Sequence, residues 1–284
     1  MQSFAVYALL KQREAEYAQL PRAKELFAMG NAVYSEGWAD NRGMKRANGA
    51  RGFESPERNA SVIKTGSLDS AAPLKPAAEQ YAIDRLNWKN LPGTAREIKA
   101  ISAVFADNSK GAGTQVDSYQ GLDASEDKLQ KLNQAGKLQD YRYLLFSAHG
   151  YLAQNPALSA LVLSQKGNPE GIDGYISASE WPLYDLKSDL TVLSACDTGV
   201  GKTQAGESVM GLPYALFVAG NKNTILTLWP VDDDATAEFM RRFFTKLKGG
   251  TAQSVALSQT KQEFMQHAQW SHPKYWAAFV LYGV

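Results

Sequence analysis

The chain has 284 residues, 44% of them hydrophobic and 21% charged, and its formal net charge is +1. This balance is typical of a globular protein, and the near-zero net charge gives no reason to expect nucleic acid or an acidic partner. No stretch reaches the roughly 18 apolar residues of a membrane-spanning helix, and residues 1–10 lack the basic start and cleavage site of a secretion signal. We therefore expect a cytoplasmic protein without a membrane span.

The first eighty residues predict a helix, a strand and a long loop. Apolar residues at helical spacing predict a helix over 4–20, which Pro21 ends, and residues 24–34 predict a strand. Over 35–80 apolar periodicity gives way to Gly, Asn, Ser, Arg and Pro. A loop this long is either functional or mobile, and a disordered surface insertion is the favoured interpretation.

The domain division follows from these elements. We expect an N-terminal helical arm at 1–22, followed by one domain at 23–284 that carries the long insertion loop.

From residue 91 onward, predicted strands and helices alternate. Two strands are strongly apolar, YRYLLFSA at 141–148 and LTVLSA at 190–195, as expected in the middle of a parallel sheet. Further strands are predicted at 115–119, 158–163, 224–228 and 276–282, and helices at 94–105, 125–132, 177–183, 208–219, 233–247 and 251–267. The alternation predicts an α/β protein with a mostly parallel central sheet and helices on both faces.

The chain contains one cysteine, Cys196. One cysteine cannot form an internal disulfide or a multi-cysteine zinc site. A free cysteine with no further context is most often a small buried hydrophobic residue. The position of this one, directly after a strong strand, favours another interpretation.

Two reactive side chains follow the two strongest strands. His149 follows the strand at 141–148, and Cys196 follows the strand at 190–195. Ligands of open parallel sheets bind beyond the carboxyl ends of the strands, so neighbouring strands would bring imidazole and thiol together. A nearby imidazole lowers the pKa of a thiol, ordinarily about 8.5, and so generates the nucleophilic thiolate. The backbone N–H groups of Gly150 and Cys196 are candidates for the oxyanion hole.

The segment LSACDTG at 193–199 resembles the signature of CHAT domains, which are bacterial relatives of caspases and separase. Cys196 follows His149 by 47 residues, close to the roughly 50 that separate these residues in caspases. Similar segments occur in the same order at 91–101, 144–150, 206–236 and 272–283. The resemblance implies a caspase-like fold and a cysteine endopeptidase with a Cys196–His149 dyad, no cofactor and no metal.

The specificity of caspases for aspartate is not expected here. Caspases carry Gln two residues before the cysteine and Gly two residues after it, where this chain has Ser194 and Thr198. The segment WPVDDD at 229–234 resembles the separase stretch that receives a basic side chain, so Asp232 or Asp233 is a candidate for a pocket that favours Arg or Lys. Acidic residues at this position also cap a helix and stabilise its dipole, and both roles stay open.

Two other functions compete with a peptidase. GVGKT at 199–203 ends like a phosphate-binding loop, but Cys196 occupies the position of the first glycine, which argues against nucleotide binding. The second is a catalytically silent caspase-like scaffold or interaction module. Members of the family often follow tetratricopeptide repeats, so besides a protein substrate we expect a regulatory or repeat-containing partner. Loops near 35–80 and 200–206 are the segments expected to reorder on activation.

Overall fold

The computed structural model describes residues 4–35, 87–106, 115–153, 155–194 and 207–283. The chain divides into two compact units, Met1–Trp38 with Trp88–Val284, and Ala39–Asn87. The fold below is that of the first unit. The long loop predicted at 35–80 lies outside the described residues, apart from Ser35, and so does the segment near 200–206.

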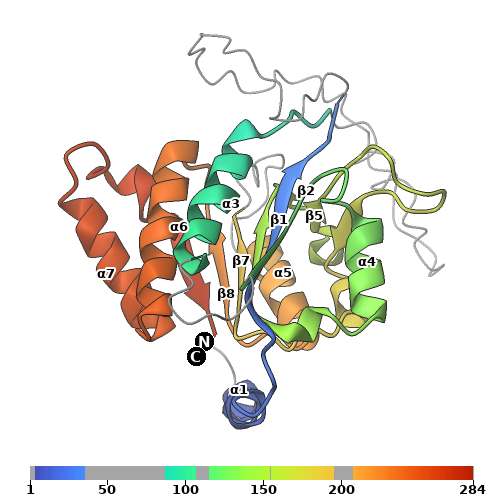
Figure 1. Ribbon diagram of the computed structural model, residues 1–284, viewed down its shortest axis with the longest axis horizontal. Coiled ribbons are helices and arrows are strands. Elements are labelled where there is room, and N and C mark those ends of the chain that lie inside the picture. Colours follow the sequence, from blue (N-terminus) through green and yellow to red (C-terminus); the bar gives the residue numbers. More distant parts are fainter. Residues whose placement is uncertain (1–3, 36–86, 107–114, 154, 195–206, 284) are drawn as a thin grey trace, which may run out of the picture. The chain divides into compact units, whose positions relative to one another are not determined.

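The described residues contain a six-stranded sheet with the strand order β2-β1-β3-β7-β8-β9 (Figure 1). Its strands are β1 Lys24–Ala32, β2 Val116–Gly121, β3 Tyr141–Ser147, β7 Leu190–Leu193, β8 Thr224–Thr227 and β9 Phe279–Tyr282. All neighbouring strands are parallel except β8 and β9, which are antiparallel. The predicted mostly parallel α/β class is confirmed.

Helices cover both faces of this sheet (Figure 1). One face carries α3 Pro92–Phe105, α6 Asp233–Lys248 and α7 Gln253–Met265, and the other carries α4 Glu126–Gln134 and α5 Glu207–Val218. Single 3-10 turns form η1 Leu138–Asp140, η2 Pro156–Leu158, η3 Trp181–Leu183 and η4 Pro273–Tyr275. Ser125 caps α4, because its hydroxyl accepts a hydrogen bond from Lys128 N at 3.2 Å.

Alternation along β3 and β7 determines which side chains face α3 and α6. Tyr143 and Leu145 of β3, and Leu190 and Val192 of β7, belong to the core shared with these two helices. Successive side chains of a strand point to opposite faces, so the next positions in these two series are 147 and 194. Both are serines, and both are buried. Hydroxyl groups therefore end two core-facing rows at the carboxyl edge of the sheet.

A second, antiparallel sheet was not predicted. It consists of β4 His149–Tyr151, β5 Ala160–Val162 and β6 Tyr175–Ser177. His149 and Gly150, which were predicted to end the strand at 141–148, instead begin a strand of this second sheet.

The prediction of a helix at 177–183 is wrong, because the structure has the end of β6 and the single turn η3 there. Glu180 accepts hydrogen bonds from the backbone and hydroxyl of Ser177, each at 2.7 Å, as at a helix start. An α-helix that began at Ser177 would need a bond from the N–H of residue 182, which is a proline, and only the single turn η3 forms, with Pro182 in its first turn.

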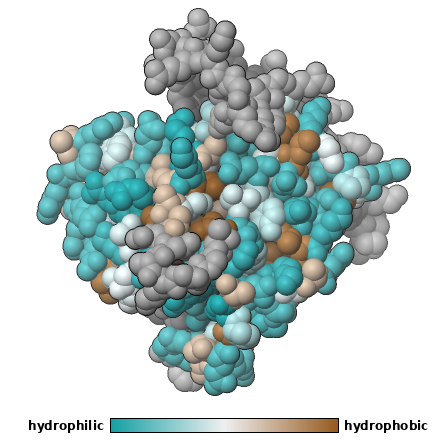
Figure 2. All heavy atoms as spheres, in the orientation of Figure 1, coloured by the Kyte–Doolittle hydropathy of each residue, from teal (hydrophilic) through white to brown (hydrophobic). Residues whose placement is uncertain are grey.

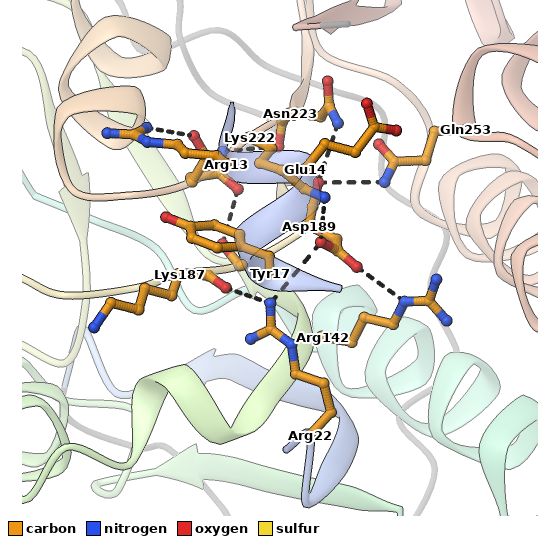
Figure 3. A network of polar contacts seen from close by, with 12 residues as sticks. Arg13, Glu14, Tyr17, Arg22, Arg142, Lys187, Asp189, Lys222, Asn223 and Gln253 are labelled. Carbon is orange, nitrogen blue, oxygen red and sulfur yellow. Dashed lines mark hydrogen bonds and ion pairs between the residues drawn. The ribbon is translucent and has the colours of Figure 1, made fainter. Parts of the chain in front are cut away.

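A network of charged groups holds the amino end of β7 (Figure 3). Asp189, whose side chain is 15% exposed, pairs with Lys222 at 2.6 Å, Arg142 at 3.0 Å and Arg22 at 3.9 Å. Helix α1, Phe4–Tyr17, lies beside this network: the Tyr17 hydroxyl donates to the Gly220 carbonyl at 2.7 Å. The network lies at the amino ends of the parallel strands, opposite the edge where ligands of such sheets bind.

Hydrophilic side chains cover most of the face shown in Figure 2, and the hydrophobic ones form small separate groups. Among the helices that the structure describes, none has the length and apolar character needed to cross a membrane.

Candidate active site

The two strands that lead to His149 and Cys196 are neighbours. Strands β3 and β7 pair in parallel, with Phe146 opposite Leu193. The ladder continues one step further, because Ser194 N donates to the Phe146 carbonyl at 2.8 Å. The two strands are therefore neighbours as far as Ser194. Cys196 itself lies outside the described residues, two positions further along the chain.

The His149 ring is buried, with the residue 2% exposed, and its tautomer follows from one contact. Nε2 lies 2.7 Å from the backbone carbonyl oxygen of Lys89. A carbonyl oxygen only accepts hydrogen bonds, so Nε2 carries the proton. In a neutral imidazole the basic lone pair is then on Nδ1, which is the nitrogen able to take a proton from a thiol.

Aromatic rings fix the orientation of this imidazole. Tyr34 lies edge-on to His149 with ring centroids 4.7 Å apart, and Trp88 lies 4.9 Å away. Both rings are themselves held, because the Tyr34 hydroxyl donates to the Val162 carbonyl at 2.9 Å and Trp88 Nε1 donates to the Tyr175 hydroxyl at 2.9 Å. Burial raises the pKa of Tyr34, which therefore stays a neutral phenol. The ring of His149 is held in one position.

The same tyrosine indicates the directions in which the backbone N–H groups of His149 and Gly150 point. His149 N donates to the Tyr34 hydroxyl at 3.2 Å, and that hydroxyl bonds the carbonyl of Val162, the register partner of His149. The N–H of His149 is thus directed towards β5. Because backbone direction alternates along a strand, the N–H of Gly150 is expected to point to the other side, where β4 forms the edge of its sheet.

Asp232 and Asp233 lie at the start of α6, after the carboxyl end of β8. Asp232 is the N-cap: its carboxylate accepts hydrogen bonds from Asp234 N at 3.1 Å and Ala235 N at 3.0 Å. Asp233 packs against the first turn of α3, where a Cβ on Gly93 would lie 1.9 Å from Asp233 Oδ2. Burial raises the pKa of the Asp233 carboxyl, and Arg96 opposes that shift.

A buried glutamate at the same edge was missed by the sequence analysis. Glu97 of α3 is 3% exposed, and its Oε2 accepts a hydrogen bond from the Ser147 hydroxyl. Burial raises the pKa of Glu97 to about 7, although the hydroxyls of Ser147 and Ser194 favour its charged form. The available signal was its spacing, because Glu97 lies four residues before Ile101 on the apolar face of the helix.

The other two histidines hold local turns. His267 Nδ1 accepts from Gln269 N, and His272 Nδ1 accepts from Lys274 N, each at 3.2 Å. Both belong to the segment after α7, so His149 is the histidine at the carboxyl edge of the parallel strands.

The sheet order and the helices on both faces define a caspase-like α/β domain. The model of the CHAT domain family matches residues 3–284, and the chain therefore belongs to the CHAT-domain family.

Two curated relatives are similar to this chain over part of its length. Tetratricopeptide repeat protein 28 of Mus musculus is 31% identical over 103 residues, and its counterpart in Homo sapiens is 32% identical over 98 residues. These matches cover 36% and 34% of this chain. The aligned segment spans 4% of the length of each relative.

Proposed function

We propose that this chain is a cysteine endopeptidase, with Cys196 as the nucleophile and His149 as the general base. The observation that carries the proposal is the bond from His149 Nε2 to the Lys89 carbonyl, which leaves Nδ1 as the basic nitrogen two residues after the end of β3. A general base needs one ring nitrogen that can accept a proton, and this bond provides that condition at Nδ1. CHAT-family membership and the caspase-like fold support the same assignment.

Chain connectivity supports a short distance between the two groups. Consecutive Cα atoms lie about 3.8 Å apart, so the Cα of residue 196 is at most about 7.6 Å from that of Ser194. Ser194 already pairs with Phe146 of β3, three residues before His149. The described chain up to Ser194 therefore supports the proposal that Cys196 lies near His149.

The proposed reaction uses only groups of this chain and water. His149 Nδ1 takes the proton of Cys196, and the thiolate attacks the carbonyl carbon of a peptide bond. The N–H groups of Gly150 and Cys196 donate to the oxyanion that forms. The imidazolium then gives its proton to the leaving amine, and water hydrolyses the thioester with His149 again acting as the base. No cofactor enters these steps.

The substrate preference is proposed from Asp232 and Asp233. Both follow β8, whose carboxyl end lies at the same edge of the sheet as that of β7. A basic side chain of a substrate would favour the charged form of the half-buried Asp233, whose pKa burial raises. Asp232 caps α6 and so holds this turn in place. We therefore expect cleavage after Arg or Lys.

A repeat-containing partner is proposed from the relatives. Both matched proteins bear the name tetratricopeptide repeat protein, and the segment similar to this chain is a small part of each. Repeats of this kind stack helices into surfaces that bind other proteins. We expect such a partner to regulate cleavage by this chain.

A peptide-library digest tests the proposed function. Wild type should cut peptides after Arg or Lys, Cys196→Ala should abolish cleavage, and His149→Ala should reduce it by about 10³-fold or more. Asp233→Asn should weaken the preference for basic residues while Cys196 stays reactive. A thiol-reactive peptide probe that fails to label wild type, together with no cleavage of any peptide, would favour the silent scaffold.

A further inference from the structure

Glu97 lies where it can join the two strands that lead to the proposed dyad. Its carboxylate accepts a hydrogen bond from the hydroxyl of Ser147, the last residue of β3 and two positions before His149. Ser194, which follows β7 and precedes Cys196 by two positions, lies close enough to favour the charged form of the same carboxyl group. One side chain from α3 thus bonds the last residue of β3 and lies near the residue that follows β7.

The backbone geometry makes this arrangement specific. Ser194 N donates to the Phe146 carbonyl, so residues 147 and 194 lie side by side at the end of the parallel ladder. Gly30 of β1 is the register partner of Ser147, and a Cβ there would lie 2.2 Å from the Ser147 carbonyl oxygen and 3.0 Å from Ile98 Cδ1. The missing side chain lets α3 come close enough for Glu97 to reach the edge of the sheet.

The stability of the core does not require a carboxylate here. A hydrophobic residue on the apolar face of α3 would bury surface without desolvating a charge. Among the described residues, Glu97 Oε1 and Ser194 Oγ are both buried and make no hydrogen bond of normal geometry. Each is the kind of partner that the other needs, since a hydroxyl can rotate to donate to a carboxyl oxygen.

We propose that Glu97 is a positioning residue that acts as a clamp. In this clamp the carboxyl group of Glu97 holds Ser147 and Ser194 together and thereby sets the spacing between His149 and Cys196. The inference rests on the proposed dyad. Glu97 does not touch the reacting atoms; it acts through the two serines. Misplacing a catalytic group by about 1 Å costs on the order of 100-fold in rate, so the clamp should be visible in kcat.

The sole cysteine provides a readout that needs no substrate. The rate of alkylation of Cys196 by iodoacetamide is measured as a function of pH, because the thiolate is the reactive form. A working dyad gives wild type a midpoint well below the ordinary thiol pKa of about 8.5. Glu97→Ala should raise this midpoint part of the way towards 8.5, while Glu97→Gln should keep it near that of wild type, since an amide can also bridge two hydroxyls.

Glu126 offers a matched control. It is also a buried glutamate, 4% exposed, but it lies on α4 and accepts hydrogen bonds from Gly174 N and Gln130 Nε2, each at 2.9 Å. Glu126→Ala should lower thermal stability without moving the alkylation midpoint. With a cleavable peptide, Glu97→Ala should lower kcat by about 10- to 100-fold with little change in KM.

Two outcomes separate the inference from the function on which it rests. If His149→Ala raises the midpoint and Glu97→Ala leaves it unchanged, the clamp is refuted and the dyad stands. If His149→Ala does not move the midpoint either, the dyad itself fails. Should Glu97→Ala not fold, Ser147→Ala removes the donor to Glu97 and is predicted to raise the midpoint in the same direction; an unchanged midpoint in that folded variant also refutes the clamp.

Discussion

The buried carboxyl group of Glu97 makes the stability of the folded chain depend on pH. Burial raises its pKa from 4.5 to about 7. The folded state therefore holds this proton more tightly than the unfolded state does, and stability falls as pH rises from about 4.5 to about 7. A difference of about 2.5 units at 1.36 kcal/mol per unit corresponds to about 3 kcal/mol, all of it lost above pH 7.

Glu97→Gln removes this titration and keeps the size of the side chain. We expect the free energy of unfolding of Glu97→Gln, minus that of wild type, to increase by about 3 kcal/mol between pH 4 and pH 8. Urea unfolding of both proteins at a series of pH values measures this difference. Comparing the two proteins cancels the titration of groups that they share, including Glu126, whose pKa burial also raises to about 7. A difference that stays constant with pH would refute a raised pKa at Glu97.

Three further substitutions test other parts of the structure. Asp189→Asn leaves three cations without their shared partner at the amino end of β7. It should lower the free energy of unfolding, measured by thermal melting, by about 2–4 kcal/mol. Asp185→Asn, at an exposed residue, should leave the free energy of unfolding within about 0.5 kcal/mol of wild type. Tyr34→Phe removes the hydroxyl between His149 N and the Val162 carbonyl, and it should lower the free energy of unfolding by about 1–3 kcal/mol and also lower kcat. Tyr214→Phe, at a 65% exposed residue, should change neither the free energy of unfolding nor kcat. Gly30→Ala places a Cβ 2.2 Å from the Ser147 carbonyl oxygen and should destabilise the domain by about 1–3 kcal/mol; equal melting temperatures would show that this close approach relaxes at no cost.

The sequence predicted the parallel sheet because its two central strands are strongly apolar and because strands alternate with helices. The two strands at 141–148 and 190–195 are long enough to show their character, and the structure pairs them as neighbours. The short strands β4, β5 and β6 have three residues each, too few for a periodic pattern. They form where tertiary contacts join them, so the chain leaves the main sheet at His149 without a local signal.

The residues that surround His149 could not be predicted from the sequence either. The Tyr34 hydroxyl lies 115 residues away along the chain, and the Lys89 carbonyl lies 60 residues away. A backbone carbonyl carries no residue-specific signal, and tyrosine and tryptophan are most often core residues. Glu97 differs, because a charged residue on the apolar face of a predicted helix can be recognised from spacing alone.

In the proposed dyad, the imidazole of His149 lowers the pKa of the thiol of Cys196. The ultraviolet absorbance of the thiolate, titrated in wild type and corrected with Cys196→Ala, measures that pKa for the one cysteine of the chain. We predict a value well below 8.5 in wild type and a return to about 8.5 in His149→Ala. Equal values in the two proteins would contradict the dyad.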